Sequence, residues 1–281
     1  MHFITISEML GTNGEKIARK VAEGLKYSFV GKEELEKAAT EMGYLSDVQK
    51  VDGEKSPPVL ERLFSERPKI YVERMQAAIY EIATKGSALF FGRGGMVLLH
   101  SFDSALHVLV TGSAEKRAEK VMKESHIGRE MAEKVLGRSD HDKRVFFRFA
   151  FDEDWLNPAL YDLVLNTDKL DVDSAAEMII DAAKSKEIKV CEIDSLRALA
   201  KLSFQRRLEA SFLEIGAHVS VTADNLESVR LYGLVHSQEM KEKVENVLTK
   251  FKEIRSVKND LIASPTGAFS RRMEGISFVS V

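Results

Sequence analysis

The sequence predicts an α/β domain, with a parallel sheet between two layers of helices, followed by a smaller α+β domain. The chain opens with a β-rich run at residues 3–7, a glycine-containing turn at 11–14 and apolar residues at helical spacing from Ile17 to Leu25. A second unit of this kind follows, with a helix at 74–84, an apolar strand at 88–91 and a glycine turn. Beyond residue 185 the order of predicted elements changes, which indicates a second domain.

Further strands and helices alternate along the first domain. Strands are predicted at 106–110 and 161–165, a charged amphipathic helix at 114–125 and an apolar helix at 175–183. Strands that alternate with helices form right-handed βαβ units around a parallel sheet. Residues 50–58 combine charge, a glycine and two prolines without periodicity, so we expect an exposed loop there. The first domain therefore comprises residues 1–185, as a three-layer parallel sheet.

The second domain is expected to span residues 190–281, after the charged segment 184–189. It shows a helical pattern followed by two alternating strand patterns, a second helical pattern and a last strand. The apolar residues of the second helix form one stripe. The order α-β-β-α-β is typical of an α+β module. These elements lie at 195–211, 218–222, 228–235, 240–251 and 255–262.

Composition excludes several classes of protein. The chain has 281 residues, 44% of them hydrophobic and 30% charged, which is typical of a globular protein. Its net charge of −3 argues against general nucleic-acid binding. Cys191 is the single cysteine, so no internal disulfide forms, and no leader-like segment precedes the first strand. The apolar runs are too short to cross a membrane. We expect a cytoplasmic protein that binds neither nucleic acid nor membranes.

A candidate phosphate-binding turn follows the first strand. It comprises Gly11, Thr12, Asn13, Gly14 and Glu15 at the start of the predicted helix. Unpaired N–H groups and the positive end of the helix dipole make such a position an anion site. A glycine turn after a strand is, however, more often only a turn.

Several segments together resemble the cytidylate kinase-like family. They are residues 4–25, with ITISEMLGTNGEKIARKVAEGL, residues 88–99, with ALFFGRGGMVLL, residues 140–163, and residues 162–179, with DLVLNTDKLDVDSAAEMI. They occur in the family's order and span the first domain. The resemblance implies a P-loop nucleoside monophosphate kinase fold, with ATP and Mg²⁺ on the donor side and CMP or a related monophosphate as acceptor.

The turn departs from the usual phosphate loop, G-x-x-x-x-G-K-[ST]. That loop supplies a lysine for the phosphates and a hydroxyl for magnesium. Here Gly14 stands at the lysine position and Glu15 at the hydroxyl position, where family members often carry an arginine. Lys16 replaces the missing cation only if it reaches back toward the phosphates. We therefore expect slow or absent phosphoryl transfer, and the sequence assigns no metal ligands.

Cations at two further places are candidates for phosphate contacts. Arg93 lies between glycines after a buried strand, where the resemblance places the acceptor phosphate; the alternative is an arginine paired with a neighbouring carboxylate. Lys143, Arg144 and Arg148 follow an apparent helix N-cap, Ser139-x-x-Asp142, and are expected to form a basic lid. The alternative is a solvated helix face, which we also predict for the charged residues Lys116, Arg117, Lys120 and Lys123.

The second domain resembles a BON domain. The resemblance rests on a strand with a glycine near its end at 229–235, the stripe helix, and a closing V-x-N-x-L strand at 257–261. It implies a module for ligand binding or association, so we expect a regulatory role, as a homodimer or with a protein partner. Three hypotheses follow: a monophosphate kinase, a non-catalytic nucleotide sensor that signals through this domain, or a scaffold.

Overall fold

The computed structural model describes residues 2–42, 66–188 and 193–264, in two compact units that are treated separately. The loop predicted at 50–58 lies outside these residues. The first unit contains residues 2–42, 81–188 and 193–197; the second contains residues 66–80 and 198–264. The predicted boundary assigns residues 66–80 to the first domain, whereas in the structure they cluster with the C-terminal residues. The boundary itself stays a prediction.

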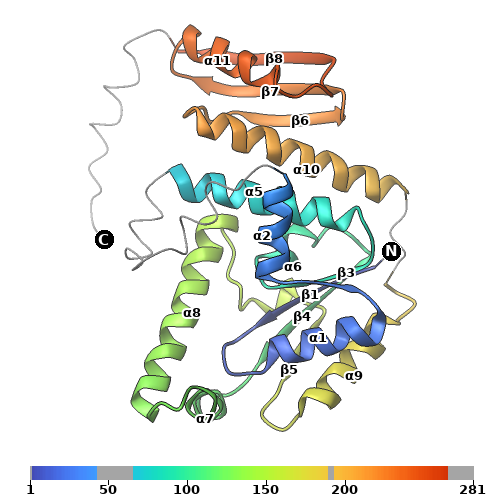
Figure 1. The fold of residues 1–281 in the computed structure, drawn as a ribbon, viewed down its shortest axis with the longest axis vertical. Helices are drawn as coiled ribbons and strands as arrows, with labels where there is room; N and C mark the ends of the chain where they lie inside the picture. The colour runs from blue at the N-terminus through green and yellow to red at the C-terminus, as the bar shows by residue number, and fades with distance from the viewer. Residues whose placement is uncertain (1, 43–65, 189–192, 265–281) are drawn as a thin grey trace. The chain divides into compact units, whose positions relative to one another are not determined.

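A five-stranded parallel sheet forms the centre of the first unit, in the order β2-β3-β1-β4-β5 (Figure 1). Its strands are β1 (Phe3–Glu8), β2 (Ser28–Val30), β3 (Ala88–Phe91), β4 (Ala105–Thr111) and β5 (Leu163–Asn166). Its helices are α1 (Gly14–Leu25), α2 (Lys32–Glu41), α6 (Gly95–Leu98), α7 (Ala114–Ser125), α8 (Arg129–Phe151), the 3₁₀ helix η1 (Pro158–Leu160) and α9 (Val172–Ala183). The predicted parallel α/β fold is confirmed. Strand β2 was not predicted, because its three residues are too few to show periodicity.

Strand β1 lies in the middle of the sheet and sets the position of the site. Phe3 pairs with Ala88 of β3 on one side and with Ala105 of β4 on the other. Five of its six residues are buried, as expected for a central parallel strand. Because β1 ends at Glu8, the glycine turn leaves the sheet at the centre of its carboxyl edge, where open α/β sheets bind ligands.

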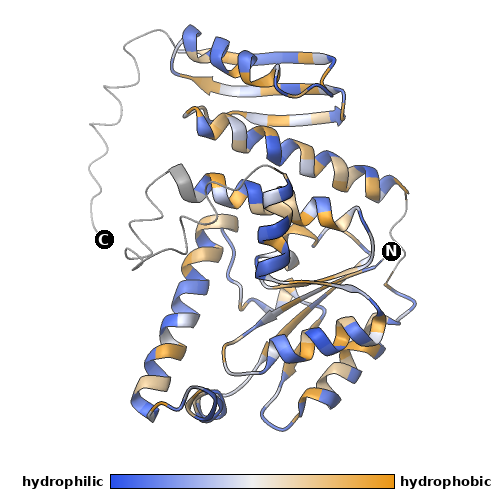
Figure 2. Cartoon of the chain, viewed as in Figure 1, coloured by the Kyte–Doolittle hydropathy of each residue, from blue (hydrophilic) through white to orange (hydrophobic). Residues whose placement is uncertain are grey.

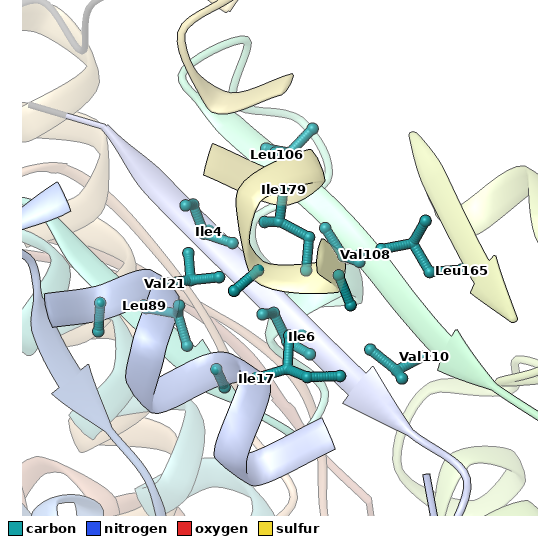
Figure 3. Close-up of a cluster of buried hydrophobic side chains, with 14 residues drawn as sticks. Ile4, Ile6, Ile17, Val21, Leu89, Leu106, Val108, Val110, Leu165 and Ile179 are labelled. Atoms are coloured by element: carbon teal, nitrogen blue, oxygen red, sulfur yellow. The ribbon is translucent and has the colours of Figure 1, made fainter. Parts of the chain in front are cut away.

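Apolar side chains pack on both faces of this sheet. On one face, Ile4 and Ile6 of β1 contact residues of α1 and α9, among them Ile17 and Ile179 (Figure 3). On the other face, residues of α6, β4 and α8 form a second cluster around Trp155. Fully burying an isoleucine side chain stabilises a fold by about 1.5–3 kcal/mol. These clusters therefore hold the carboxyl ends of β1 and β3, where the site lies.

Helix α8 is one continuous helix of 23 residues that begins at Arg129, so the predicted N-cap at Ser139 is wrong. The helix is anchored on both sides of that residue. Leu136 is buried against α7, and Asp140 forms an ion pair with Arg117 of α7. Figure 2 shows polar and apolar residues alternating along α8, as expected for a helix with one buried face.

The second unit has the predicted α-β-β-α-β order, and a further helix, α5 (Glu66–Ala83), contributes residues to it. The other elements are α10 (Ile193–Glu214), β6 (Ser220–Asn225), β7 (Ser228–Val235), α11 (Gln238–Leu248) and β8 (Ser256–Ala263). Strand β7 pairs antiparallel with β6 and parallel with β8. Helices α10 and α11 share one buried cluster with these strands. Within the described part of the chain, no helix has the length and apolar character of a membrane span.

Candidate functional site

A pocket of about 610 Å³ opens at the carboxyl edge of β1 and β3, and α1, α2 and α8 complete its walls. One part of the lining is aromatic and the other is charged. The aromatic residues are Phe29, Phe91, Phe146, Phe147 and Trp155. The charged residues are Glu8, Glu15, Arg19, Lys32, Glu33, Glu34, Arg93, Asp142 and Lys143.

The predicted glycine turn lies at the start of a helix, as expected. Helix α1 begins at Gly14, and Asn13 is its N-cap with a left-handed φ of 61°. Gly11 also has a positive φ, 85°, and a Cβ there would lie 2.8 Å from the carbonyl oxygen of Arg117. A Cβ at Gly14 would lie 2.6 Å from both Cβ and Oε2 of Glu8. Glycine is therefore required at both positions by close contacts.

The side chain of Glu8 occupies the anion position of this turn. The backbone N–H of Gly14 donates to Glu8 Oε2 at 2.9 Å. Burial raises the pKa of the Glu8 carboxyl above its ordinary value, while Lys143 and the hydrogen bond from Gly14 act in the opposite direction. A carboxylate of the chain thus takes the hydrogen bond that a bound phosphate takes in a phosphate loop. This contact counts against the prediction that the Gly14 amide binds a phosphate.

Lys143 lines the pocket from α8. Its ammonium group donates to the backbone carbonyl of Glu8 and lies 5.2 Å from the centre of the Trp155 ring. Burial lowers the pKa of Lys143, against the attraction of Glu8 and Asp140. Helix α8 and the end of β1 are therefore in direct contact through this side chain.

Arg93 lines the pocket from the turn after β3. It has a positive φ of 57°, between Gly92 and Gly94, which are also left-handed. Such a backbone holds a non-glycine side chain at a cost of about 1 kcal/mol or more. Among the residues described by the structure, none forms a hydrogen bond or ion pair with Arg93. The phosphate-binding role of Arg93 stays a prediction.

The structure places the other predicted site residues away from the centre of the pocket. Lys16 forms an ion pair with Glu124 at 2.7 Å and does not line the pocket. Arg144 is exposed, and Arg148 lies near Asp152 at the end of α8. Of the three predicted lid cations, the structure brings only Lys143 to the pocket.

Two residues of the turn itself face other partners. Glu15 pairs with Arg19 at 2.8 Å, one helical turn further on, so its charge is compensated at the rim of the pocket. Thr12 is buried and its hydroxyl donates to the carbonyl of Met9 at 2.7 Å. Thr12 therefore stabilises the turn.

The sequence predicts a solvated position for Arg117, whereas the structure buries it. The side chain is only 4% exposed, because its Nε donates to the carbonyl of Leu10 at 2.8 Å and both terminal nitrogens donate to Asp140. The prediction was wrong because the neighbouring charged residues do face solvent, and because Asp140 lies 23 positions away. No local spacing identifies the pair.

The aromatic part of the pocket has two sides. Phe29 and Phe91 stack at a centroid distance of 6.2 Å, and the Arg19 guanidinium lies 4.1 Å from the centre of the Phe29 ring. On the other side, Phe147 packs on Trp155. Phe147 of α8 is thus buried in this cluster. No sequence signal identified Phe29 as part of the site.

The residues present do not fit Mg²⁺ and ATP in the usual manner. The described residues contain no cluster of three or more His, Cys, Asp or Glu side chains suited to a metal ion. Glu15 stands at the hydroxyl position, and the Gly14 amide already donates to Glu8. The donor side of this pocket therefore differs from a standard phosphate loop.

Comparisons with known proteins agree with the fold. The family model described as "Cytidylate kinase-like family" matches residues 3–169. A cytidylate kinase from Methanocaldococcus jannaschii is 26% identical over 188 residues, which are 64% of this chain and 96% of that protein.

Solved structures with a similar fold include an uncharacterised protein from Eubacterium ventriosum. It has a TM-score of 0.54 at 22% identity, over 66% of this chain and 99% of the other. A shikimate kinase from Bacteroides thetaiotaomicron has a TM-score of 0.41 at 9% identity, over 66% of this chain and 99% of the other. With a family model that matches more than half of its length, the chain belongs to the cytidylate kinase-like family.

Proposed function

We propose that this protein binds a nucleoside monophosphate in the pocket at the carboxyl edge of the sheet and phosphorylates it only slowly. Family membership supports a nucleotide kinase-like function. The relative from Methanocaldococcus jannaschii is named cytidylate kinase, which makes CMP the first candidate for the acceptor. The slow rate is proposed because the turn lacks both the lysine and the hydroxyl of a phosphate loop.

One observation carries the proposal: Arg93 lines a pocket of nucleotide size and makes no polar contact with the described residues. A volume of about 610 Å³ is within the range of small-molecule sites. The planar guanidinium suits a phosphate, which it can bind through two hydrogen bonds. The stacked rings of Phe29 and Phe91 offer an apolar surface for a base.

The roles of the chain's own residues follow from their positions. Arg93 binds and orients the acceptor phosphate. Lys143 supplies a positive charge near the end of β1, where it offsets charge that develops during transfer. The aromatic walls exclude water from the reacting groups. Arg144 and Arg148 are proposed to contribute only if α8 changes position.

A non-catalytic nucleotide sensor is the second candidate, and the contact between Glu8 and Gly14 favours it. That contact removes a donor from the phosphate turn but leaves the Arg93 side of the pocket unchanged. The signal would pass through the BON-like domain, which we propose acts by forming a homodimer or by binding a protein partner. Sedimentation velocity with and without CMP tests that role, and a single monomeric species in both conditions would exclude the homodimer.

The deciding experiment is calorimetric titration of the full chain with CMP, UMP, AMP and GMP, followed by a coupled assay with ATP and Mg²⁺. We expect one monophosphate to bind and its turnover to lie well below the usual range of about 1–1000 per second. Binding without turnover would favour the sensor. If no monophosphate binds, both the kinase and the sensor are excluded and a scaffold role remains.

A further inference from the structure

We propose that Glu8 determines ligand selection in this pocket: it closes the phosphate turn to polyphosphates and leaves the Arg93 side available to a single phosphate. The inference rests on the proposed function, because that function assigns the pocket to nucleotides. It concerns which part of a nucleotide the pocket accepts.

The first step is the position of the Glu8 carboxylate. Glu8 is the last residue of the central strand β1, and Gly14 is the first residue of α1. The five-residue connection returns the chain so that Oε2 of Glu8 accepts the Gly14 N–H at 2.9 Å. The first N–H groups of a helix have no partner within the helix, so this carboxylate is bound where an external anion would be bound.

The second step is that phosphate and carboxylate exclude each other. A Cβ at position 14 would lie 2.6 Å from both Cβ and Oε2 of Glu8, so the carboxylate already lies in contact with the backbone of the turn. A phosphate at the same amide must displace Glu8 or approach it as a second anion. Either route weakens polyphosphate binding, by tenfold or more on the scale of one charge-assisted hydrogen bond.

The third step is that Lys143 contacts the same residue. Its ammonium group donates to the backbone carbonyl of Glu8, so this cation is already hydrogen-bonded beside the turn. Arg93, by contrast, comes from the turn after β3 and contacts none of these groups in the described structure. On the β3 side the pocket therefore offers Arg93 to a ligand, whereas on the β1 side Lys143 is already hydrogen-bonded to Glu8.

The experiment compares the unmodified chain with Glu8→Ala, using inorganic tripolyphosphate as a probe of the turn and CMP as a probe of the Arg93 side. Calorimetry is expected to show at least tenfold tighter tripolyphosphate binding in Glu8→Ala, with CMP affinity changed less than threefold. Glu23→Ala, which removes an exposed glutamate from α1, is the matched control for net charge and should not bind tripolyphosphate more tightly. Circular dichroism melting of each variant verifies the fold.

Glu8→Gln is the second variant, for the case in which Glu8→Ala does not fold. Its amide oxygen still accepts from Gly14 but carries no charge, so we expect a smaller gain in tripolyphosphate affinity. Equal tripolyphosphate affinity in the unmodified chain and in the variants, or no binding to any of them, would overturn the inference. A gain with tripolyphosphate but no binding of CMP would support the role of Glu8 and overturn the proposed monophosphate site.

Discussion

Arg117 of α7 and Asp140 of α8 form a two-pronged ion pair, with nitrogen-to-oxygen distances of 2.9 and 2.8 Å. The same guanidinium donates through Nε to the carbonyl of Leu10, the residue before the candidate phosphate turn. One buried side chain therefore joins the start of the turn to α7 and α8. Bidentate geometry and burial make this pair stronger than the exposed ion pairs of the same helices.

We expect Arg117→Met to lower the free energy of unfolding by about 3 kcal/mol, because it leaves Asp140 and the Leu10 carbonyl without their partner. Urea denaturation at neutral pH measures the change. The neighbouring Lys116→Met, at an exposed residue paired with Glu119, is the control and should change stability by about 0.5 kcal/mol or less. Similar losses for the two variants would mean that the buried pair is no stronger than a surface pair.

Arg93→Ala is expected to weaken CMP binding by about 2 kcal/mol, or roughly thirtyfold, the scale of a lost charge-assisted contact. Stability should change little, because no described residue pairs with Arg93 and the left-handed backbone strain is common to both side chains. Calorimetry and thermal melting of the same preparation separate the two effects. Lys123→Ala removes an exposed cation of α7 outside the pocket and serves as the control. Parallel losses of binding and melting temperature in Arg93→Ala would identify a structural arginine.

His107 makes folding stability depend on pH. It is 4% exposed on β4, its Nδ1 lies 2.8 Å from the Thr5 hydroxyl, and burial lowers its pKa from 6.5 to about 4. Asp162 opposes this shift and His100 adds to it. Between these values the unfolded chain takes up a proton that the folded chain does not. This group therefore does not reduce the free energy of unfolding above about pH 6.5, and it reduces that free energy increasingly as the pH falls toward 4.

Urea denaturation between pH 4 and pH 7 tests this dependence. The side chain of His107→Asn does not titrate, and its amide retains a partner for Thr5. We expect the free energy of unfolding of this variant to fall between pH 7 and pH 4 by about 3 kcal/mol less than that of the unmodified chain. His141→Asn, at an exposed position of α8, is the control and should follow the unmodified chain. If the free energy of unfolding depends on pH equally in His107→Asn and in the unmodified chain, this histidine is not the cause of the pH dependence.

The fold was largely predictable from the sequence because its signals are local. The apolar strand 88–91 and the helix at 114–125 correspond closely to β3 and α7, since periodicity and fully apolar runs are properties of adjacent residues. The error at Ser139 has the same origin. A capping pattern is a local signal, and here the packing of α8 on α7 overrides it.

The site was less predictable because its contacts join residues that are distant in the sequence. The predicted strand ends at residue 7 and the predicted turn begins at residue 11, so the sequence assigns no role to Glu8. Its contact with Gly14 appears only in the folded chain. Lys143 was identified as a cation of the lid, but its contact with Glu8, 135 positions away, has no sequence signature. Motif comparison correctly located the altered turn, whereas the side chain that fills it was visible only in three dimensions.

Restoring a standard phosphate loop requires a lysine and a hydroxyl in the turn. The sequence alone suggests Gly14→Lys with Glu15→Ser, which would supply the missing lysine and hydroxyl. In the structure a Cβ at position 14 would lie 2.6 Å from Cβ and Oε2 of Glu8, distances that Cβ atoms do not tolerate. The double variant is therefore expected to lose stability, by about 1–3 kcal/mol as for an overpacked site, and to show no gain in rate.

Adding Glu8→Ser removes both the obstructing atoms and the competing carboxylate, so the triple variant should fold and should transfer phosphate from ATP to CMP faster than the unmodified chain. One restored electrostatic contact in a transition state is worth about 3 kcal/mol, which corresponds to roughly a hundredfold in rate. Glu8→Ser alone is the control, because it opens the turn without supplying the lysine. A triple variant that folds, binds CMP and is no faster than this control would show that the missing lysine and hydroxyl do not limit the reaction.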